Sequence, residues 1–138
     1  MRKSKTALLR IFLLMILAYH LILCAVTFLP AETAKQASHL FFGMEIAADS
    51  QIVYMSRLFG MYAAIFGISM GIAAIDPPRY RLLLIFGGIL FFARAINNIM
   101  MIEYLRSVFH MPLVRIWQCI ITLVIFGTSL FVLLPEKE

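Results

Sequence analysis

Four long apolar stretches alternate with short polar segments along the chain. They run roughly over residues 7–29, 52–75, 81–102 and 112–134. A helix needs about 20 apolar residues to cross about 30 Å of hydrocarbon, and backbone groups in lipid must hydrogen-bond within their own segment. The pattern therefore predicts an all-α integral membrane protein in which each stretch is a spanning helix.

Composition supports a membrane protein with a single domain. The chain has 138 residues, of which 63% are hydrophobic and 14% charged. A chain of this length has room for one membrane domain, residues 1–138, with most of its side chains against lipid or neighbouring helices. The formal net charge is +5, but the basic residues are divided among the N-terminus, one loop and the spans. They form no continuous stripe, so we expect no nucleic-acid partner.

The basic residues in the loops and near the ends of the spans predict the orientation in the membrane. Loops on one side carry only Lys35 and Arg106. The other side carries more of them: Arg2, Lys3, Lys5, Arg10, Arg79, Arg81 and Lys137. Cytoplasmic loops are enriched in lysine and arginine. We therefore expect a multi-pass protein of the cell inner membrane, with both termini in the cytoplasm.

The segment between the first two spans, residues 30–51, has a pattern of its own. Apolar residues recur there at helical spacing, and polar residues lie between them on the opposite side. The apolar set is Ala37, Leu40, Phe41, Met44 and Ala48, and the polar set is Lys35, Ser38, Glu45 and Asp49. This spacing predicts a short amphipathic helix at the outer membrane interface. It is either a simple connector or a lid that turns Glu45 or Asp49 toward the arginines described next.

Three arginines, Arg57, Arg94 and Arg115, fall inside the predicted spans. An arginine at membrane depth costs at least about 2.5–3.5 kcal/mol, so such residues usually face protein or water rather than lipid. At about 1.5 Å per residue, His20 and Arg94 lie about 20 Å from the cytoplasmic end of their spans. The same count places Arg57 and Arg115 about 5–8 Å from the opposite end. We expect the outer half of the bilayer to collect these residues together with Cys24, Asn97, Asn98, Gln118 and Cys119.

Helical spacing predicts that each span turns one polar stripe inward, as in a four-helix bundle. In the second span, Arg57 shares a helix face with small residues, and small residues let membrane helices approach closely. We expect this helix-packing stripe to comprise Gly60, Ala64, Gly67 and Gly71. The other stripes run through His20 and Cys24, through Arg94 and Asn98, and through Arg115 and Gln118.

The predicted polar stripes suggest a binding site. Guanidinium groups suit carboxylate, phosphate or sulfonate, and apolar walls beside them suit an amphipathic molecule. We therefore predict a non-catalytic site for a membrane lipid or an anionic amphiphile. Its expected ligand-binding residues are His20, Arg57, Arg94, Asn97, Asn98, Arg115 and Gln118. The two cysteines lie in separate spans and no His/Cys cluster exists, so we expect neither a cofactor nor a metal.

Several structural interpretations of these residues remain open. Arg57 and Arg115 are near enough to the interface for their charged ends to reach the headgroups. Arg94 could be neutralised by Glu45, Asp49 or Glu103. The asparagines and the glutamine could hydrogen-bond between helices, and His20 could be a core residue. The chain would then be an accessory subunit of a membrane complex or a homo-oligomeric interaction protein.

Two family resemblances bear on function. Arg57-x-x-Gly60, Gly67 and the inner-loop run 76–81 (DPPRYR) resemble the BphX-like and DoxX-like small bacterial inner-membrane proteins. That resemblance implies a four-span fold and assigns no catalytic residue. Arg94-Ala95-Ile96-Asn97 with Glu103 is similar to the signature of the MAPEG membrane glutathione transferases. It implies a glutathione-dependent enzyme, although the spacing departs from that pattern and lies in the third span.

Overall fold

The computed structural model describes residues 2–45 and 50–135, and its regular structure there is entirely helical. Four of the helices are long and apolar enough to cross a membrane. The all-α prediction and its four long helices are therefore confirmed. In chain order the helices are α1 (Arg2–Thr27), α2 (Ala31–Phe42), α3 (Ser50–Ile75), α4 (Arg81–Met100), α5 (Ile102–Val108) and α6 (Leu113–Val132).

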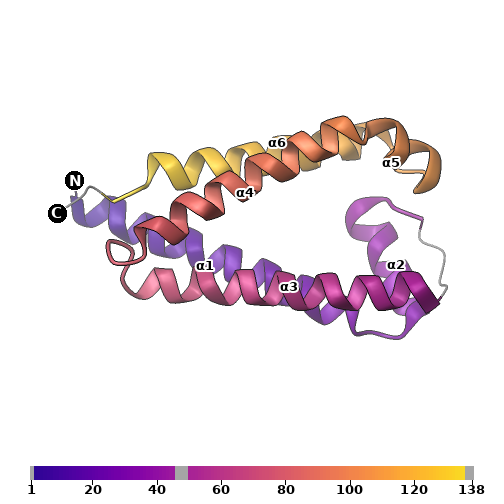
Figure 1. The fold of residues 1–138 in the computed structure, drawn as a ribbon, viewed down its shortest axis with the longest axis horizontal. Helices are drawn as coiled ribbons and strands as arrows, with labels where there is room; N and C mark the ends of the chain where they lie inside the picture. Colours follow the sequence, from indigo (N-terminus) through magenta and orange to yellow (C-terminus); the bar gives the residue numbers. More distant parts are fainter. Residues whose placement is uncertain (1, 46–49, 136–138) are drawn as a thin grey trace.

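The four long helices run side by side, with the chain reversing direction between successive ones (Figure 1). Both termini and the α3–α4 turn lie at one end of the molecule, which we call the terminal end. The short helices α2 and α5 lie at the other, which we call the distal end (Figure 1). This arrangement matches the even number of crossings that the hydropathy pattern predicts.

The long helices pack as two pairs, α1 with α3 and α4 with α6. Small residues bring α3 close to α1: a Cβ added at Gly67 would lie 2.8 Å from the Cβ of His20, and one at Gly71 would lie 2.8 Å from Cδ2 of Leu17. Glycine is required where helices approach this closely, because any larger side chain would collide with the neighbouring helix.

In the second pair, glycines on both α4 and α6 allow the helices to pack closely. A Cβ at Gly88 of α4 would lie 2.7 Å from the ring of Phe131, and one at Gly127 of α6 would lie 2.9 Å from the ring of Phe92. Each helix therefore supplies a glycine that receives an aromatic ring from the other. The stacked rings of Phe92 and Phe131, with centroids 6.0 Å apart, fill the space between them.

The two pairs meet in the terminal half of the molecule and diverge toward the distal end (Figure 1). Where they meet, all four long helices contribute to one apolar core. Its buried residues are Leu9, Leu13, Ile16, Met70, Ala73, Ala74, Leu84, Phe91 and Leu130. Edge-to-face ring contacts from Phe12 to Phe126 and from Phe126 to Phe91 continue this core across the pairs.

A separate apolar cluster forms at the distal end, and no residue of α1 or α3 belongs to it. It joins α4, α5 and α6 to the last residue of α2 and the segment that follows. The buried members are Ala95, Met111, Ile116 and Ile120, with Phe42, Met44, Ile102, Leu105, Cys119 and Leu123 packed against them. Helix α2 ends at Gly43, whose φ of 67° lies in the left-handed region. The Glu45 N–H then donates a 2.9 Å hydrogen bond to the carbonyl of Phe109.

Helix α2 thus leaves the α1–α3 pair at Pro30 and reaches the α4–α6 pair at Gly43, crossing the distal end between them (Figure 1). It is shorter than the predicted amphipathic segment. Leu40 and Phe41 on its expected apolar side are exposed. Ala48 and Asp49, also assigned to this helix, lie outside the described residues.

Helix α5 is a feature that the sequence pattern did not predict. It begins directly after α4, and the break at Met101 still carries hydrogen bonds from Met101 N–H to the Asn97 carbonyl and from Leu105 N–H to the Met101 carbonyl. At seven residues it is too short to show a clear periodicity.

Two arginine side chains tie the terminal end together. Arg10 donates a 3.0 Å hydrogen bond to the carbonyl of Ile75, at the end of α3. Arg81, at the start of α4, donates a 3.0 Å bond to the carbonyl of Pro135, beyond α6. The bond from Arg10 satisfies a carbonyl that the end of α3 would otherwise leave without an intrahelical donor.

Candidate functional site

Arg94 and Asn98 on α4 lie on the face that the two helix pairs share. Asn98 follows Phe91 by seven residues and Leu84 by fourteen, and both of those side chains are buried. Seven residues are close to two turns, so Asn98 has the same direction from the helix axis. Arg94 lies between Phe91 and Asn98 and is half-buried. Among the described residues, none forms a hydrogen bond or salt bridge with Arg94.

Arg115, in the first turn of α6, is exposed, and it contributes a second guanidinium group near Cys119. The Cys119 thiol, one turn beyond Arg115 on α6, is within electrostatic range of both guanidinium groups. Arg115 Nη1 is 3.4 Å from Gln118 Oε1, a long hydrogen bond on its own helix. A Cβ added at Gly43 would lie 3.4 Å from Cγ of Arg115, so this arginine is also next to the end of α2.

His20 on α1 completes the group and is its most buried polar residue, with 2% of its surface exposed. Its ring centroid is 4.9 Å from that of Phe66 on α3 and 6.4 Å from that of Phe91 on α4. His20 and its neighbour Tyr19 are both within electrostatic range of Arg94. We refer to His20, Arg94, Asn98 and Arg115, with Tyr19 and Cys119 beside them, as the Arg94 cluster.

Arg57 does not join this cluster, so the prediction of three arginines in one chamber is wrong. The glycine stripe of α3 faces α1, and Phe66 and Met70 lie on the side of that stripe nearer α4. At 100° per residue, Arg57 falls on the opposite side of the stripe. It has the direction of Ile75, eighteen residues later and 74% exposed. Arg57 is itself exposed and points away from α4 and α6.

Two of the predicted ligand-binding residues, Asn97 and Gln118, also point away from the Arg94 cluster. Asn97 follows Leu90 by seven residues and is exposed like it. Gln118 precedes Ile125 by seven residues, and both are exposed. Neither residue lies on the face that its helix turns toward the other pair. Asn97 was predicted from its depth in the membrane alone, and depth says nothing about direction around the helix. Gln118 was also predicted to share a stripe with Arg115, but at 100° per residue the two differ by about 60° around α6.

The predicted small-residue stripe lies against α1, with one difference in register. Gly60 and Gly67 are buried, and a Cβ at Gly60 would collide with Oγ1 of Thr27. Gly71 meets Leu17, but Ala64 is only half-buried and Ala63 is the alanine buried in this contact. The stripe is thus covered by a helix of the same chain rather than left open to another protein.

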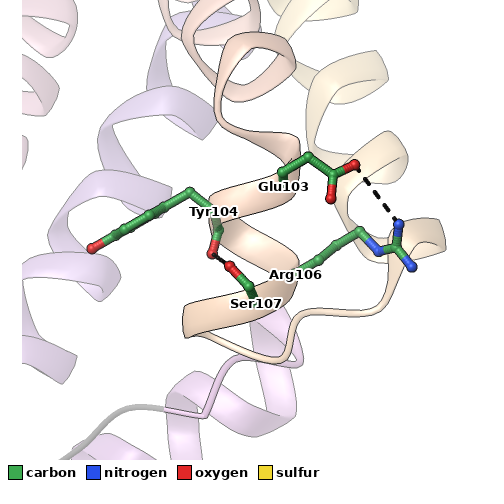
Figure 2. A network of polar contacts seen from close by, with 4 residues as sticks. All are labelled: Glu103, Tyr104, Arg106 and Ser107. Atoms are coloured by element: carbon green, nitrogen blue, oxygen red, sulfur yellow. Dashed lines mark hydrogen bonds and ion pairs between the residues drawn. The ribbon is translucent and has the colours of Figure 1, made fainter.

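None of the described carboxylates neutralises Arg94. Figure 2 shows Glu103 on α5 turned toward Arg106, and their closest N–O distance is 4.0 Å. In the same view Ser107 Oγ donates to the Tyr104 carbonyl at 3.5 Å. Glu45 is exposed and makes no side-chain hydrogen bond or ion pair in the described part of the chain. Asp49 lies outside the described residues.

A small cavity of about 70 Å³ lies elsewhere, between the end of α1, the first turns of α2 and the start of α3. Its walls are mainly apolar, with one lysine at α2 and a few hydroxyl groups. The lining includes Val26, Thr27, Ala34, Lys35, Ser38 and Val53. No arginine lines it, so it is separate from the Arg94 cluster. No sequence pattern predicts this cavity, because it depends on the angle at which α2 crosses the pair.

The next question is whether any described residues are placed to bind a metal ion. Within residues 2–45 and 50–135, no group of three or more His, Cys, Asp or Glu side chains is placed to hold an ion. Cys24 and Cys119 are free thiols on different helix pairs. The cluster has an excess of hydrogen-bond donors, a composition that suits an anion.

Comparison with known proteins identifies no relative of this chain. No family model matches it, and no curated protein or solved structure matches it significantly. The resemblance to the BphX-like and DoxX-like proteins therefore stays a prediction. Function must be argued from the geometry of the Arg94 cluster.

Proposed function

We propose that the chain is a multi-pass protein of the cell inner membrane, folded as a four-helix bundle with both termini in the cytoplasm. Four helices of sufficient length and hydropathy support this proposal. So does the gathering of Lys5, Arg10, Arg79 and Arg81 at the terminal end, as the positive-inside rule requires. Helix α2 would then lie at the outer interface. The BphX-like and DoxX-like proteins fit this fold and location.

Within that membrane, the protein binds an anionic amphiphile through the Arg94 cluster, without catalysing a reaction on it. The observation that carries this proposal is Arg94 itself. It is a half-buried guanidinium in the middle of an apolar helix, and no described residue pairs with it. Such a group is costly in a membrane unless an anion joins it. Arg115 adds a second charge beside the same thiol, Cys119.

The chemistry of the Arg94 cluster restricts the class of molecule that it could bind. Guanidinium groups donate forked hydrogen bonds to carboxylate, phosphate or sulfonate. The Asn98 amide lies on the same face of α4, and the aromatic rings of Phe66 and Phe91 lie just toward the terminal end. A charged head therefore binds at Arg94 while the tail of the molecule lies against apolar side chains. Fatty acids and anionic membrane lipids have this form.

The test uses two arginines of the same chain. Arg94→Leu removes the proposed anion contact, and Arg57→Leu is the matched control, because Arg57 is also a spanning arginine but faces away. Detergent-purified proteins are titrated with hexadecanoate and with hexadecyl phosphate, and bound complexes are counted by native mass spectrometry. A charge-assisted hydrogen bond contributes about 1.5–3 kcal/mol, so Arg94→Leu should weaken binding about tenfold to a hundredfold.

Arg57→Leu should bind both probes as the wild type does. Equal weakening by the two substitutions would contradict the proposal, since it would mean that the probes respond only to net charge. An undiminished affinity in Arg94→Leu would contradict it directly.

An interaction protein is the second candidate, and one observation favours it. Arg57 is an exposed arginine on the outward side of a spanning helix. In a complex, a carboxylate of another membrane chain or of a second copy would pair with it. Arg57→Leu should then shift the oligomeric mass measured by light scattering in detergent. A mass unchanged by the substitution would remove this candidate.

The third candidate, a glutathione-dependent enzyme of the MAPEG type, has less support from the geometry. Its faint signature needs Arg94, Asn97 and Glu103 to act together. Asn97 lies on the exposed side of α4, and Glu103 faces Arg106 on α5. These residues point in three directions, so nothing in the described residues assembles a thiol site from them.

A further inference from the structure

The ring of His20 has one satisfied nitrogen and one that is not. Nδ1 is 2.8 Å from the carbonyl oxygen of Ile16, one turn earlier on α1. A carbonyl only accepts, so Nδ1 carries the hydrogen of this bond. Nε2 is buried and has no hydrogen-bond partner among the described residues. Buried polar atoms are nearly always paired, so an unpaired one needs an explanation.

The orientation of the ring places Nε2 toward the second helix pair. Because Nδ1 turns back to its own helix, Nε2 points away from α1. The surrounding rings are Phe66 of α3 and Phe91 of α4, neither of which offers a strong acceptor or donor. Arg94 is one turn beyond Phe91 and within electrostatic range of the His20 ring. The unpaired nitrogen and the unpaired guanidinium therefore face the same region.

The chemistry of Nε2 follows from the charge of its neighbour. A second positive charge close to Arg94 inside an apolar span would be costly, so the ring is neutral. In a neutral ring whose Nδ1 carries the hydrogen, Nε2 is an acceptor. A hydrogen-bond donor, such as a hydroxyl group, would therefore complement Nε2, whereas an anion would complement Arg94.

We propose that the ligand carries a hydroxyl group next to its anionic group, with the anion bound by Arg94 and the hydroxyl donating to Nε2 of His20. This inference rests on the proposed function and names the class of amphiphile. Two sources share the chemistry: a 2-hydroxy fatty acid, and the glycerol headgroup of phosphatidylglycerol. His20 would be the residue that selects the hydroxyl.

The test compares probes that differ only in that hydroxyl. One pair is 2-hydroxyhexadecanoate and hexadecanoate, and the other is phosphatidylglycerol and phosphatidylmethanol, an anionic lipid without headgroup hydroxyls. Each probe is titrated into the wild type, into His20→Phe and into the control His39→Phe, whose histidine is exposed on α2. Affinities come from native mass spectrometry, and the pair that shows a preference identifies the source.

We expect the wild type and His39→Phe to prefer one hydroxylated probe about tenfold, the effect of one hydrogen bond to a buried group. His20→Phe should lose this preference, so that its affinities for the two members of that pair become equal within about threefold. The wild-type comparison needs no variant, so a folding defect in His20→Phe would leave it intact.

Two results would overturn the inference while leaving the proposed function standing. One is a wild type that binds both members of each pair equally. The other is a His20→Phe variant that retains the preference or changes its affinity for both probes alike, as expected if Nε2 serves only to pair with Arg94. If no anionic probe binds the wild type at all, the proposed function fails and the inference fails with it.

Discussion

The terminal and distal halves of the molecule differ in how the two helix pairs meet. In the terminal half, all four long helices share one apolar core, and arginines at the helix ends are bonded to backbone carbonyls. In the distal half, the apolar cluster joins α4, α5 and α6 to the end of α2 and the residues after it, and includes no described residue of α1 or α3. The unpaired polar groups, Arg94 and His20 Nε2, lie where the shared core ends.

The residues that stabilise the fold therefore lie in one half, and the residues that we propose bind a ligand lie at the edge of the other. Packing between the pairs is concentrated where no polar group is needed. Beyond Phe91 the helix pairs diverge (Figure 1), and none of the described residues pairs with Arg94 or with Nε2 of His20. A protein built only as a scaffold would have little reason to keep a guanidinium there. Substitutions in the two halves should therefore have opposite effects on stability.

The largest effect is expected in the terminal half, at Leu84. Leu84→Ala removes a side chain that is fully buried among all four helices, which leaves a cavity in the shared core. We expect the free energy of unfolding to fall by about 2–5 kcal/mol. Unfolding in mixed micelles by increasing dodecyl sulfate, followed through the single tryptophan Trp117, measures it.

Leu82→Ala is the matched control for this measurement. Leu82 lies on the same helix two residues earlier and is 70% exposed. Its replacement should change the free energy of unfolding by less than about 0.5 kcal/mol. Equal losses from the two leucines would mean that α4 does not bury the Leu84 face.

The next effect is expected in the distal half and has the opposite sign. Arg94→Leu replaces an unpaired charge by an apolar side chain of lower burial cost. In the absence of ligand, the free energy of unfolding should rise by about 1–3 kcal/mol. The same unfolding assay, run on protein stripped of bound lipid, measures this. Arg94→Lys keeps the charge and should leave stability nearly unchanged. A loss of stability in Arg94→Leu would show that a carboxylate of the chain already pairs with Arg94.

The smallest effect is expected at the distal surface. Glu103→Gln removes the exposed pair with Arg106, shown in Figure 2, and such pairs contribute little because water screens them. The free energy of unfolding should change by less than about 0.5 kcal/mol. A loss of several times that size would indicate that Glu103 neutralises a buried arginine instead.

Sequence reasoning recovered the elements better than it recovered the directions of side chains. The ends of α3, α4 and α6 fall within two residues of the predicted spans, because hydropathy sets the length of a spanning helix directly. The seven-residue α5 has no such signal. The crossing of α2 depends on Phe42 and Met44 packing against α4–α6, which no local pattern in residues 30–51 indicates.

The predicted site failed in part for a physical reason visible in α3. That helix is apolar on all sides, so its sequence marks a glycine stripe without indicating which neighbour the stripe meets. The stripe meets α1, and this turns Arg57 outward. Around α4, by contrast, the buried residues Leu84 and Phe91 define the inward face, and Asn98, which helical spacing groups with Phe91, lies on it. Rotation about the helix axis could be predicted only where polar and apolar faces of the helix differ.

If Arg94 faces the protein interior and Arg57 faces outward, labels at the two positions should differ in their contact with lipid. Arg94→Cys and Arg57→Cys, each made with Cys24 and Cys119 replaced by alanine, are labelled with bimane and reconstituted into vesicles. Brominated lipid quenches the fluorescence of a label that contacts acyl chains. We expect strong quenching at position 57 and weak quenching at position 94. Equal quenching at the two positions, or stronger quenching at 94, would contradict these orientations.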